Sequence, residues 1–343
     1  MDDIANNLSS LQFESALGEE ETRLLPLRYR AHAVNVSTCA QATYLVHILN
    51  EVRQSVLESR QSKQEKLLQE TVTRDPTLVG IIGCGRLGKQ LVNSFLVFGR
   101  CQPQDIFVST RRPESVQTLA DQGVNIIFDN AKVAKSVHVL FIACLPSQLP
   151  VVCKDIRGSI NYSTLVYSLV AVTPVSKLCQ LLSFKNVFRP EIELLSLDDS
   201  CYYPGDMTKD VIESCRDTRV CAMTCPLERP AKGSLVKTHD NWVMGVTLSF
   251  LNTCALLHLN MLESFQLVNT IILQTPDQQI VSTSDLTVGR HECDELKPLA
   301  LCSLTSTAAE QPNLKAKLMD SSVRQLFINK YISIFRIPRL LQK

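Results

Sequence analysis

A glycine-rich loop between a strand and a helix, Gly83-Cys84-Gly85-Arg86-Leu87-Gly88, constrains this chain more than any other sequence feature. The apolar run over residues 78–82 predicts a buried strand that ends at the loop, and the residues after the loop place apolar side chains on one helix face. Three glycines at this spacing, at a strand-to-helix turn, are typical of a phosphate-binding loop. A tight turn that binds nothing is the alternative.

Each glycine has its own expected role. Gly83 allows the tight turn, Gly85 lets the backbone approach a pyrophosphate, and Gly88 lets the helix pack close to the sheet. The helix N-terminus then presents free N–H groups and its positive dipole end to the phosphates. The loop therefore predicts a dinucleotide site.

After the breaker Asp75-Pro76, short apolar runs alternate with helical patterns, which predicts a parallel sheet with crossover helices. The expected strands cover residues 78–82, 105–110, 124–128, 138–143, 165–169 and 186–188. The expected helices cover residues 86–98, 113–122, 148–156 and 174–182. We therefore expect an α/β fold, a Rossmann-type doubly wound parallel sheet followed by a mostly helical C-terminal domain.

The segments before and after this α/β region predict further structural parts of the chain. Residues 1 to about 35 show no sustained period and predict a loose extension, while apolar residues from Ala40 to Val56 recur at the spacing of an amphipathic helix. Long helical patterns return over residues 242–275 and 314–334. The expected parts are an N-terminal extension with an amphipathic helix (1–75), a dinucleotide-binding domain (76–190), a connector (191–240) and a helical C-terminal domain (241–343).

The end of the second strand decides which dinucleotide is bound. Ser109-Thr110-Arg111-Arg112 stands where NAD-binding chains usually place an acid for the ribose hydroxyls. Arginine side chains bind the 2′-phosphate of NADP through two hydrogen bonds, whereas a carboxylate would repel it. The sequence therefore predicts NADP(H), with a solvated basic turn as the alternative.

Composition argues against several classes of function. With 35 Lys and Arg against 34 Asp and Glu, the chain has no electrostatic footprint for nucleic acid. The scattered 13 cysteines indicate reduced intracellular thiols, and Cys215, Cys221 and Cys225 lack the paired spacing of a zinc site. The acidic first residues argue against a signal or transit peptide, so we expect a cytoplasmic protein with no metal and no membrane span.

Three segments resemble the cofactor half of the pyrroline-5-carboxylate reductase family. They are residues 79–88, residues 107–112 and the run Val139-Leu140-Phe141-Ile142-Ala143-Cys144-Leu145-Pro146. The resemblance covers residues 77–190 well and the C-terminal part in outline. It implies that Cys144, Leu145 and Pro146 join the glycine loop and the Ser109–Arg112 segment in binding NADP, and that the helical domain packs against a second subunit.

The chain departs from this family on the substrate side. Leu145-Pro146 replaces Lys-Pro, Ala171-Val172 replaces Ala-Gly, and Arg189 is retained without the Pro-Asn that follows it in the family. The family's Ser-Pro-Gly-Gly-Thr-Thr segment has no counterpart. We therefore expect little or no reduction of pyrroline-5-carboxylate.

Two functions follow from these observations. The first is an NADP-dependent oxidoreductase that transfers hydride between NADPH and a small carbonyl or imine. The alternative is a catalytically inactive NADP(H)-binding sensor or scaffold. No motif identifies catalytic residues, and we expect His138 and His258 to be structural. The uncharged stretch Trp242–Leu262 predicts a homodimer through the C-terminal helices, with an intramolecular core helix as the alternative.

Overall fold

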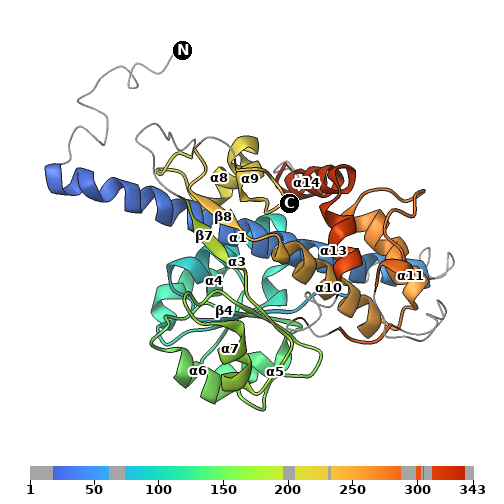
Figure 1. Ribbon diagram of the computed structural model, residues 1–343. Helices are drawn as coiled ribbons and strands as arrows, with labels where there is room; N and C mark the ends of the chain where they lie inside the picture. Colours follow the sequence, from blue (N-terminus) through green and yellow to red (C-terminus); the bar gives the residue numbers. More distant parts are fainter. Residues whose placement is uncertain are drawn as a thin grey trace.

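The computed structural model shows a parallel sheet flanked by helices, with a long N-terminal helix running through the centre (Figure 1). The residues that it describes are 18–61, 74–195, 205–230, 233–286, 299–302, 304 and 311–336.

The sheet has six parallel strands in the order β3-β2-β1-β4-β5-β6. This is the doubly wound order, which reverses direction between β1 and β4. The strands are β1 (Val79–Ile82), β2 (Ile106–Ser109), β3 (Asn125–Ile127), β4 (Val139–Ile142), β5 (Leu165–Ser168) and β6 (Val187–Phe188). All six expected strands are confirmed to within two residues at each end.

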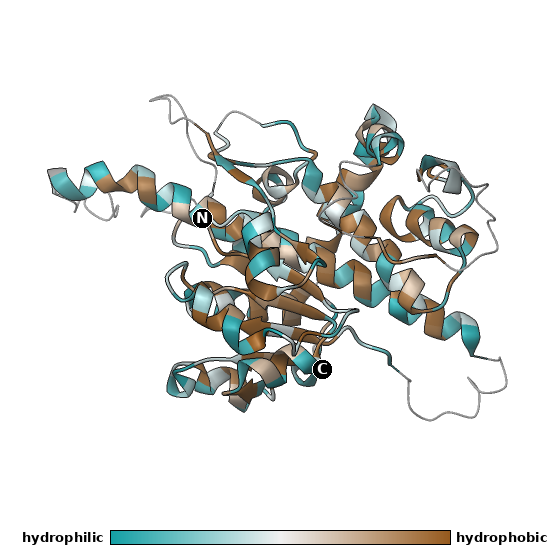
Figure 2. Ribbon diagram, turned by 60° about the horizontal axis from the view of Figure 1, so that its bottom comes forward, coloured by the Kyte–Doolittle hydropathy of each residue, from teal (hydrophilic) through white to brown (hydrophobic). Residues whose placement is uncertain are grey.

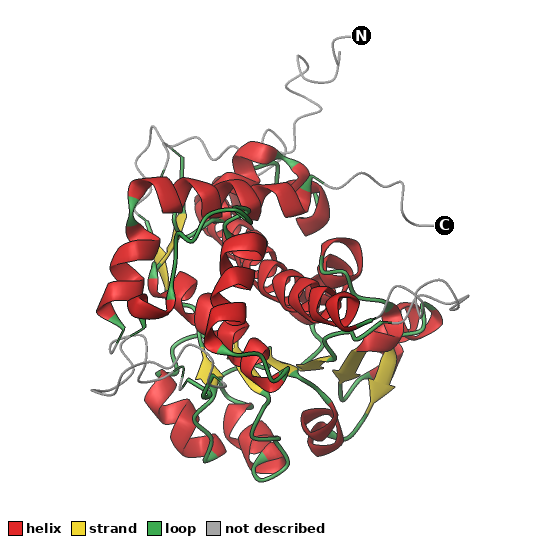
Figure 3. Cartoon of the chain, turned by 90° about the vertical axis from the view of Figure 1, so that its right-hand side faces the viewer, coloured by secondary structure: helices red, strands yellow, loops and turns green. Residues whose placement is uncertain are grey.

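Successive residues of β1 face opposite sides of the sheet, as the period of a strand requires. Val79 and Ile81 join the apolar cluster on the side of α1 and α3, while Ile82 joins the cluster on the side of α5, α6 and α7. Figure 3 shows helices on both sides of the sheet. Both faces are therefore covered, and the fold class is confirmed.

The helices between the strands agree with the expected ranges, with two exceptions, the turn of residues 103–105 and the helix of residues 130–136. They are α3 (Arg86–Phe98), the 3-10 turns η4 (Pro103–Asp105) and η5 (Pro113–Val116), α4 (Gln117–Asp121), α5 (Asn130–Ser136), α6 (Leu149–Ile156) and α7 (Val175–Leu182). Helix α5 was not expected, because two turns are too short to show a helical period.

The N-terminal helix α1 (Glu19–Arg60) differs from expectation in length and in burial. It begins at Glu19, so the prediction of a loose extension to residue 35 was wrong over residues 19–35; residues 1–17 lie outside the described part. Residues 36–50 are buried on every side of the helix rather than on one face. The helix packs against α3, α9 and α10, so it is a central core element and not an amphipathic helix leaning on a neighbour.

The part after the large sheet opens with a small antiparallel sheet and two short helices. Strand β7 (Ile192–Leu194) pairs with β8 (Val236–Thr238), and α8 (Val211–Arg216) and α9 (Thr218–Thr224) lie between them in sequence. The remaining elements are α10 (Asn241–Leu256), α11 (Met261–Leu267), the π-helical segment η6 (Val268–Ile272), the 3-10 turn η7 (Thr283–Asp285), α13 (Pro312–Met319) and α14 (Ser321–Phe335).

Helix α10 explains the uncharged stretch. Its residues are buried by elements of the same chain, among them α1, α11 and η6, and Trp242, Val243 and Phe250 are at most 1% exposed. Residues 242–252 of the stretch therefore form part of an intramolecular core helix, whereas several of residues 253–262 are partly exposed.

Candidate dinucleotide site

The glycine loop lies at the carboxyl end of β1, where the strand order reverses. The N–H of Gly83 donates to the carbonyl of Ser109 at the end of β2, at 3.1 Å. Its φ is +96°, and a Cβ at this position would stand 2.8 Å from the backbone nitrogen of Cys144. Only glycine combines this left-handed conformation with so close an approach of the β4 end.

The other two glycines differ in what surrounds them. A Cβ at Gly88 would stand 2.8 Å from the carbonyl oxygen of Gly83, so the start of α3 packs directly on the loop. A Cβ at Gly85 would meet no atom within 4 Å. The space in front of Gly85 is therefore free for a ligand, as the expected role of this residue requires.

Helix α3 begins with an open N-terminus. Gly85 is its N-cap and offers no side chain to the first N–H groups, and the first turn holds no acidic residue. Arg86 is exposed and Leu87 half-buried. The free N–H groups and the positive dipole end together form an anion-binding position.

The β2 end supplies two positive charges. Arg111 and Arg112 are exposed, and within the described residues neither forms an ion pair. Thr110 accepts the N–H of Arg112 through its hydroxyl at 3.2 Å. The buried hydroxyl of Ser109 instead donates to Oδ1 of Asn130, at 2.6 Å, so Ser109 supports the loop rather than facing solvent.

Asn130 was not expected to belong to this site. It is the first residue of α5, after Asp129, whose carboxylate accepts the N–H groups of Ala131 and Lys132. The Asp-Asn pair after the third strand is an N-cap signal, and that signal could have identified the position.

The β4 end lies beside the glycine loop, on the other side of β1 from the β2 end. Cys144 is half-buried there, and burial raises the pKa of its thiol. Leu145 is 62% exposed, and Pro146 is exposed beside it. All thirteen residues of the expected cofactor set thus belong to the carboxyl ends of β1, β2 and β4.

The carboxyl ends of β5 and β6 carry two features that sequence reasoning only noted as departures. Val172 has a φ of +70° and is 89% exposed, which is a strained conformation for a β-branched residue. Arg189 follows β6 and is half-buried; its Nε is buried and has no hydrogen-bond partner among the described residues.

Near this end lies a small polar cluster at the start of α10. The backbone N–H of His239 donates to the carbonyl of Glu191, and its Nδ1 lies 3.0 Å from Oδ1 of Asp240. Lys315 of α13 donates to Oδ1 of Asn241 at 2.8 Å. The helical part thus brings polar groups close to the β6 end.

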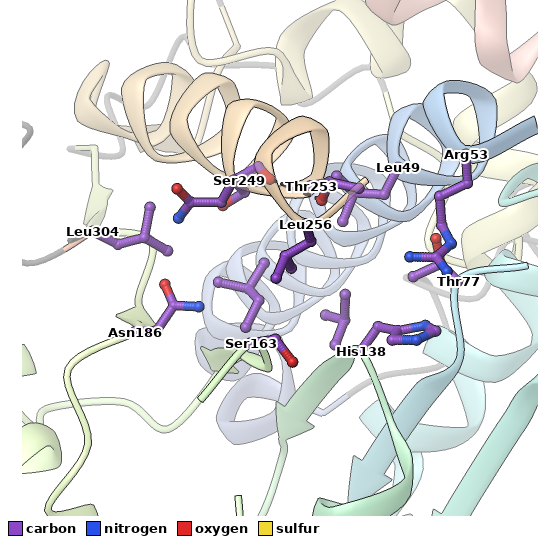
Figure 4. Close-up of a pocket in the computed structure, with 13 residues that line it drawn as sticks. Leu49, Arg53, Thr77, His138, Ser163, Asn186, Ser249, Thr253, Leu256 and Leu304 are labelled. Carbon is purple, nitrogen blue, oxygen red and sulfur yellow. Dashed lines mark hydrogen bonds between the residues drawn. The ribbon is translucent and has the colours of Figure 1, made fainter. Parts of the chain in front are cut away.

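A cavity of about 30 Å³ lies at the opposite, amino end of the sheet (Figure 4). Part of its lining consists of residues one or two positions before strands, namely Thr77, His138, Ser163 and Asn186. His138 accepts the N–H of Leu78, and burial lowers its pKa to about 4, so it is a neutral structural residue at pH 7. The cavity is far smaller than a dinucleotide needs.

The cysteines in the described part of the chain are buried or half-buried. They are free, and burial raises the pKa of those with a resolved shift, which keeps them protonated. The residues described hold no cluster of side chains suited to a metal ion. They also contain no helix that is long and apolar enough to span a membrane.

Comparison with known proteins gives a family match within the dinucleotide-binding part and a relative that matches most of the chain. Residues 78–171 match the family model described as "NADP oxidoreductase coenzyme F420-dependent". The chain is 31% identical to NADP-dependent oxidoreductase domain-containing protein 1 of Mus musculus over 274 residues, which are 79% of this chain and 73% of the mouse protein.

Shorter matches reach the pyrroline-5-carboxylate reductases. The Escherichia coli enzyme is 32% identical over 105 residues, which are 30% of this chain and 39% of that enzyme. A solved pyrroline-5-carboxylate reductase from Coxiella burnetii aligns with a TM-score of 0.32 and 15% identity, covering 76% of this chain and 99% of that chain.

Proposed function

The chain belongs to the family of NADP-dependent oxidoreductase domain-containing protein 1, which is related to the pyrroline-5-carboxylate reductases, and we propose that it is an NADP-dependent reductase of a small carbonyl or imine. The family match extends well beyond the dinucleotide-binding region, since it covers 79% of the chain. The catalytic residues and the substrate are not identified by it.

One observation carries the proposal: two exposed arginines stand at the end of β2, where no acid is present, beside an open glycine loop. The free space at Gly85 admits a pyrophosphate to the N-terminus of α3. Arg111 and Arg112 then suit the 2′-phosphate, because a guanidinium binds a phosphate through two parallel hydrogen bonds. These residues fit NADP(H) better than NAD(H).

The β4, β5 and β6 ends are the substrate side in this proposal. Bound NADPH supplies a hydride to an electrophilic carbon. The chain's own contribution there is to orient the acceptor and exclude water, for which the exposed Leu145 and Val172 offer an apolar rim. Arg189, whose Nε has no hydrogen-bond partner among the described residues, is a cation at this edge that is available to a polar group of the substrate.

The test is NADPH oxidation by the purified protein across small aldehydes, ketones and cyclic imines. We expect turnover with one of these classes and little or none with pyrroline-5-carboxylate, because its carboxylate anchors are missing. Turnover of pyrroline-5-carboxylate near about 10 per second, the median for enzymes, would show that the missing anchors are not needed. Tight NADPH binding without any turnover would instead favour the inactive sensor or scaffold.

The partner and compartment are also proposals. The free thiols of the described cysteines agree with a reducing compartment such as the cytoplasm, which cell fractionation tests. A homodimer remains expected from the family resemblance. In such a dimer, residues 242–252 of α10 would not form the contact face, because they are covered by their own chain.

A further inference from the structure

Phe128 places an exposed aromatic ring at the carboxyl edge of the large sheet. The strands of this sheet are largely hydrophobic in Figure 2, and none of their residues is exposed. Phe128 lies one residue beyond the end of β3 and is 67% exposed. Single exposed apolar residues are common on protein surfaces, so exposure alone identifies no site. The position of this ring relative to the cofactor residues is more informative.

The backbone on both sides of Phe128 is held in place. Before it, Ile127 pairs with Ser109 of β2. After it, the carboxylate of Asp129 accepts two N–H groups at the start of α5, and Asn130 accepts the hydroxyl of Ser109 at 2.6 Å. The segment that carries the ring is therefore tied to the end of β2, which the two arginines of the candidate site follow.

The covalent structure of NADP(H) relates this position to the rest of the site. The 2′-phosphate and the adenine are carried by adjacent carbons of one ribose, so a phosphate bound by Arg111 and Arg112 holds the base beside the end of β2. The pyrophosphate leads toward Gly85 on the β1 side, and β3 is the neighbour of β2 on the other side. Because neighbouring strands are about 4.8 Å apart, a base on that ribose reaches the end of β3.

We propose that Phe128 is the adenine platform of the NADP(H) site, with the base stacked on its ring. The inference rests on NADP(H) as the cofactor and adds a residue to its adenosine half. A base stacks on an aromatic side chain through the apolar faces of both rings, without a hydrogen bond. NADPH and NADH carry the same adenine, so Phe128 contributes to the affinity for both, whereas Arg111 and Arg112 act on the 2′-phosphate alone.

Calorimetric titration of the full chain with adenosine 2′,5′-bisphosphate tests the platform, because this probe holds the adenine, the ribose and the 2′-phosphate but no nicotinamide. Phe128→Ala is expected to weaken binding of the probe at least about fivefold, as loss of one base-aromatic stack does. NADPH and NADH should lose affinity by the same factor, so the preference between them stays unchanged. The urea midpoint should also stay unchanged, because the ring is mostly exposed in the folded chain.

Phe128→Trp retains an aromatic face and should bind the probe within about twofold of the wild-type affinity. The probe should also quench the fluorescence of the introduced indole, a signal that the buried Trp242 does not supply. Tyr162→Ala is the matched control, because Tyr162 is an aromatic residue that is 78% exposed and precedes β5, at the amino end of the sheet. It should bind the probe with wild-type affinity.

The outcomes separate this proposal from the proposed function. Probe binding that Phe128→Ala leaves unchanged, in a chain that still binds NADPH, would overturn the platform alone. So would a loss confined to NADPH, because that pattern belongs to the 2′-phosphate, or an equal loss in Tyr162→Ala. A wild-type chain that binds neither NADPH nor the probe would overturn the cofactor site and the platform together.

Discussion

Gly88 packs so closely on Gly83 that a Cβ at Gly88 would stand 2.8 Å from the Gly83 carbonyl oxygen. The contact fixes the start of α3 against the end of β1. We predict that Gly88→Ala forces the loop to shift, lowers the unfolding free energy by about 1 to 3 kcal/mol and weakens NADPH and NADH alike. Urea unfolding and a binding titration check both effects. A variant with unchanged stability and unchanged affinity would show that the contact is dispensable.

Gly85→Val, unlike Gly88→Ala, should leave the stability of the fold unchanged. The backbone at Gly85 is extended, with φ −81° and ψ −152°, and no atom lies within 4 Å of its Cβ position, so the fold accommodates valine. The valine side chain would nevertheless occupy the space that a pyrophosphate needs. We expect wild-type stability with both dinucleotides lost. Retained binding in this folded variant would mean that the phosphates lie elsewhere.

The sheet and the loop could be predicted because their signals are local. Each strand is a short apolar run between breakers, and the doubly wound order follows from alternating strands and helices. The apolar spacing predicted a helix over part of α1, but not its burial on every side, because the partners of its polar residues are remote in sequence. Gln41 donates to Thr238, 197 residues away, and Asn50 donates to the carbonyl of Gly99. Sequence periodicity does not reveal such long-range pairs.

The candidate site likewise has a part with local sequence signals, which could be predicted, and a part that depends on remote contacts, which could not. The glycine loop and the arginines of β2 are adjacent in sequence to strands, so strand order alone brings them together. The support of Ser109 by Asn130 depends on the unexpected helix α5. The unpartnered Nε of Arg189 depends on packing around the β6 end, which no local pattern describes.

Two buried tyrosines allow a matched test of hydrogen bonding in the core. The hydroxyl of Tyr167 accepts from Nε1 of Trp242 at 2.9 Å, whereas the hydroxyl of Tyr44 is buried without a partner in the described residues. Tyr167→Phe should lower the unfolding free energy by about 1 to 3 kcal/mol, because it leaves a buried N–H unsatisfied. Tyr44→Phe should be neutral or stabilising. Equal losses in urea unfolding would refute the distinction.

His47 makes stability depend on pH. Burial lowers its pKa to about 4, and its Nδ1 donates to the carbonyl of Phe98 in the neutral form. Between pH 6.5 and 4 the unfolded chain therefore binds a proton that the folded chain does not, so stability falls as the pH is lowered. The effect amounts to at most about 3 kcal/mol. His47→Gln should reduce the slope of unfolding free energy against pH without abolishing it, because His138 also has a pKa of about 4. An unchanged slope would exclude His47 as a source of the pH dependence.

Arg111 and Arg112 should determine the choice of dinucleotide. Replacing both with alanine removes the charges that suit the 2′-phosphate, so NADPH affinity should fall while NADH affinity stays almost unchanged. In a matched control, alanine replaces Lys132 and Lys135 of α5, which are exposed and lie outside the expected cofactor set. Loss of NADPH affinity in that control would point to a general effect of charge.

The central claim is that the open glycine loop and the two arginines form an NADP(H) site. Calorimetric titration of the purified wild-type chain with NADPH and with NADH tests it most directly. We predict that NADPH binds at least about tenfold more tightly, since a charge-assisted phosphate contact contributes about 1.5 to 3 kcal/mol. Equal affinity for the two dinucleotides, or tighter binding of NADH, would contradict the account.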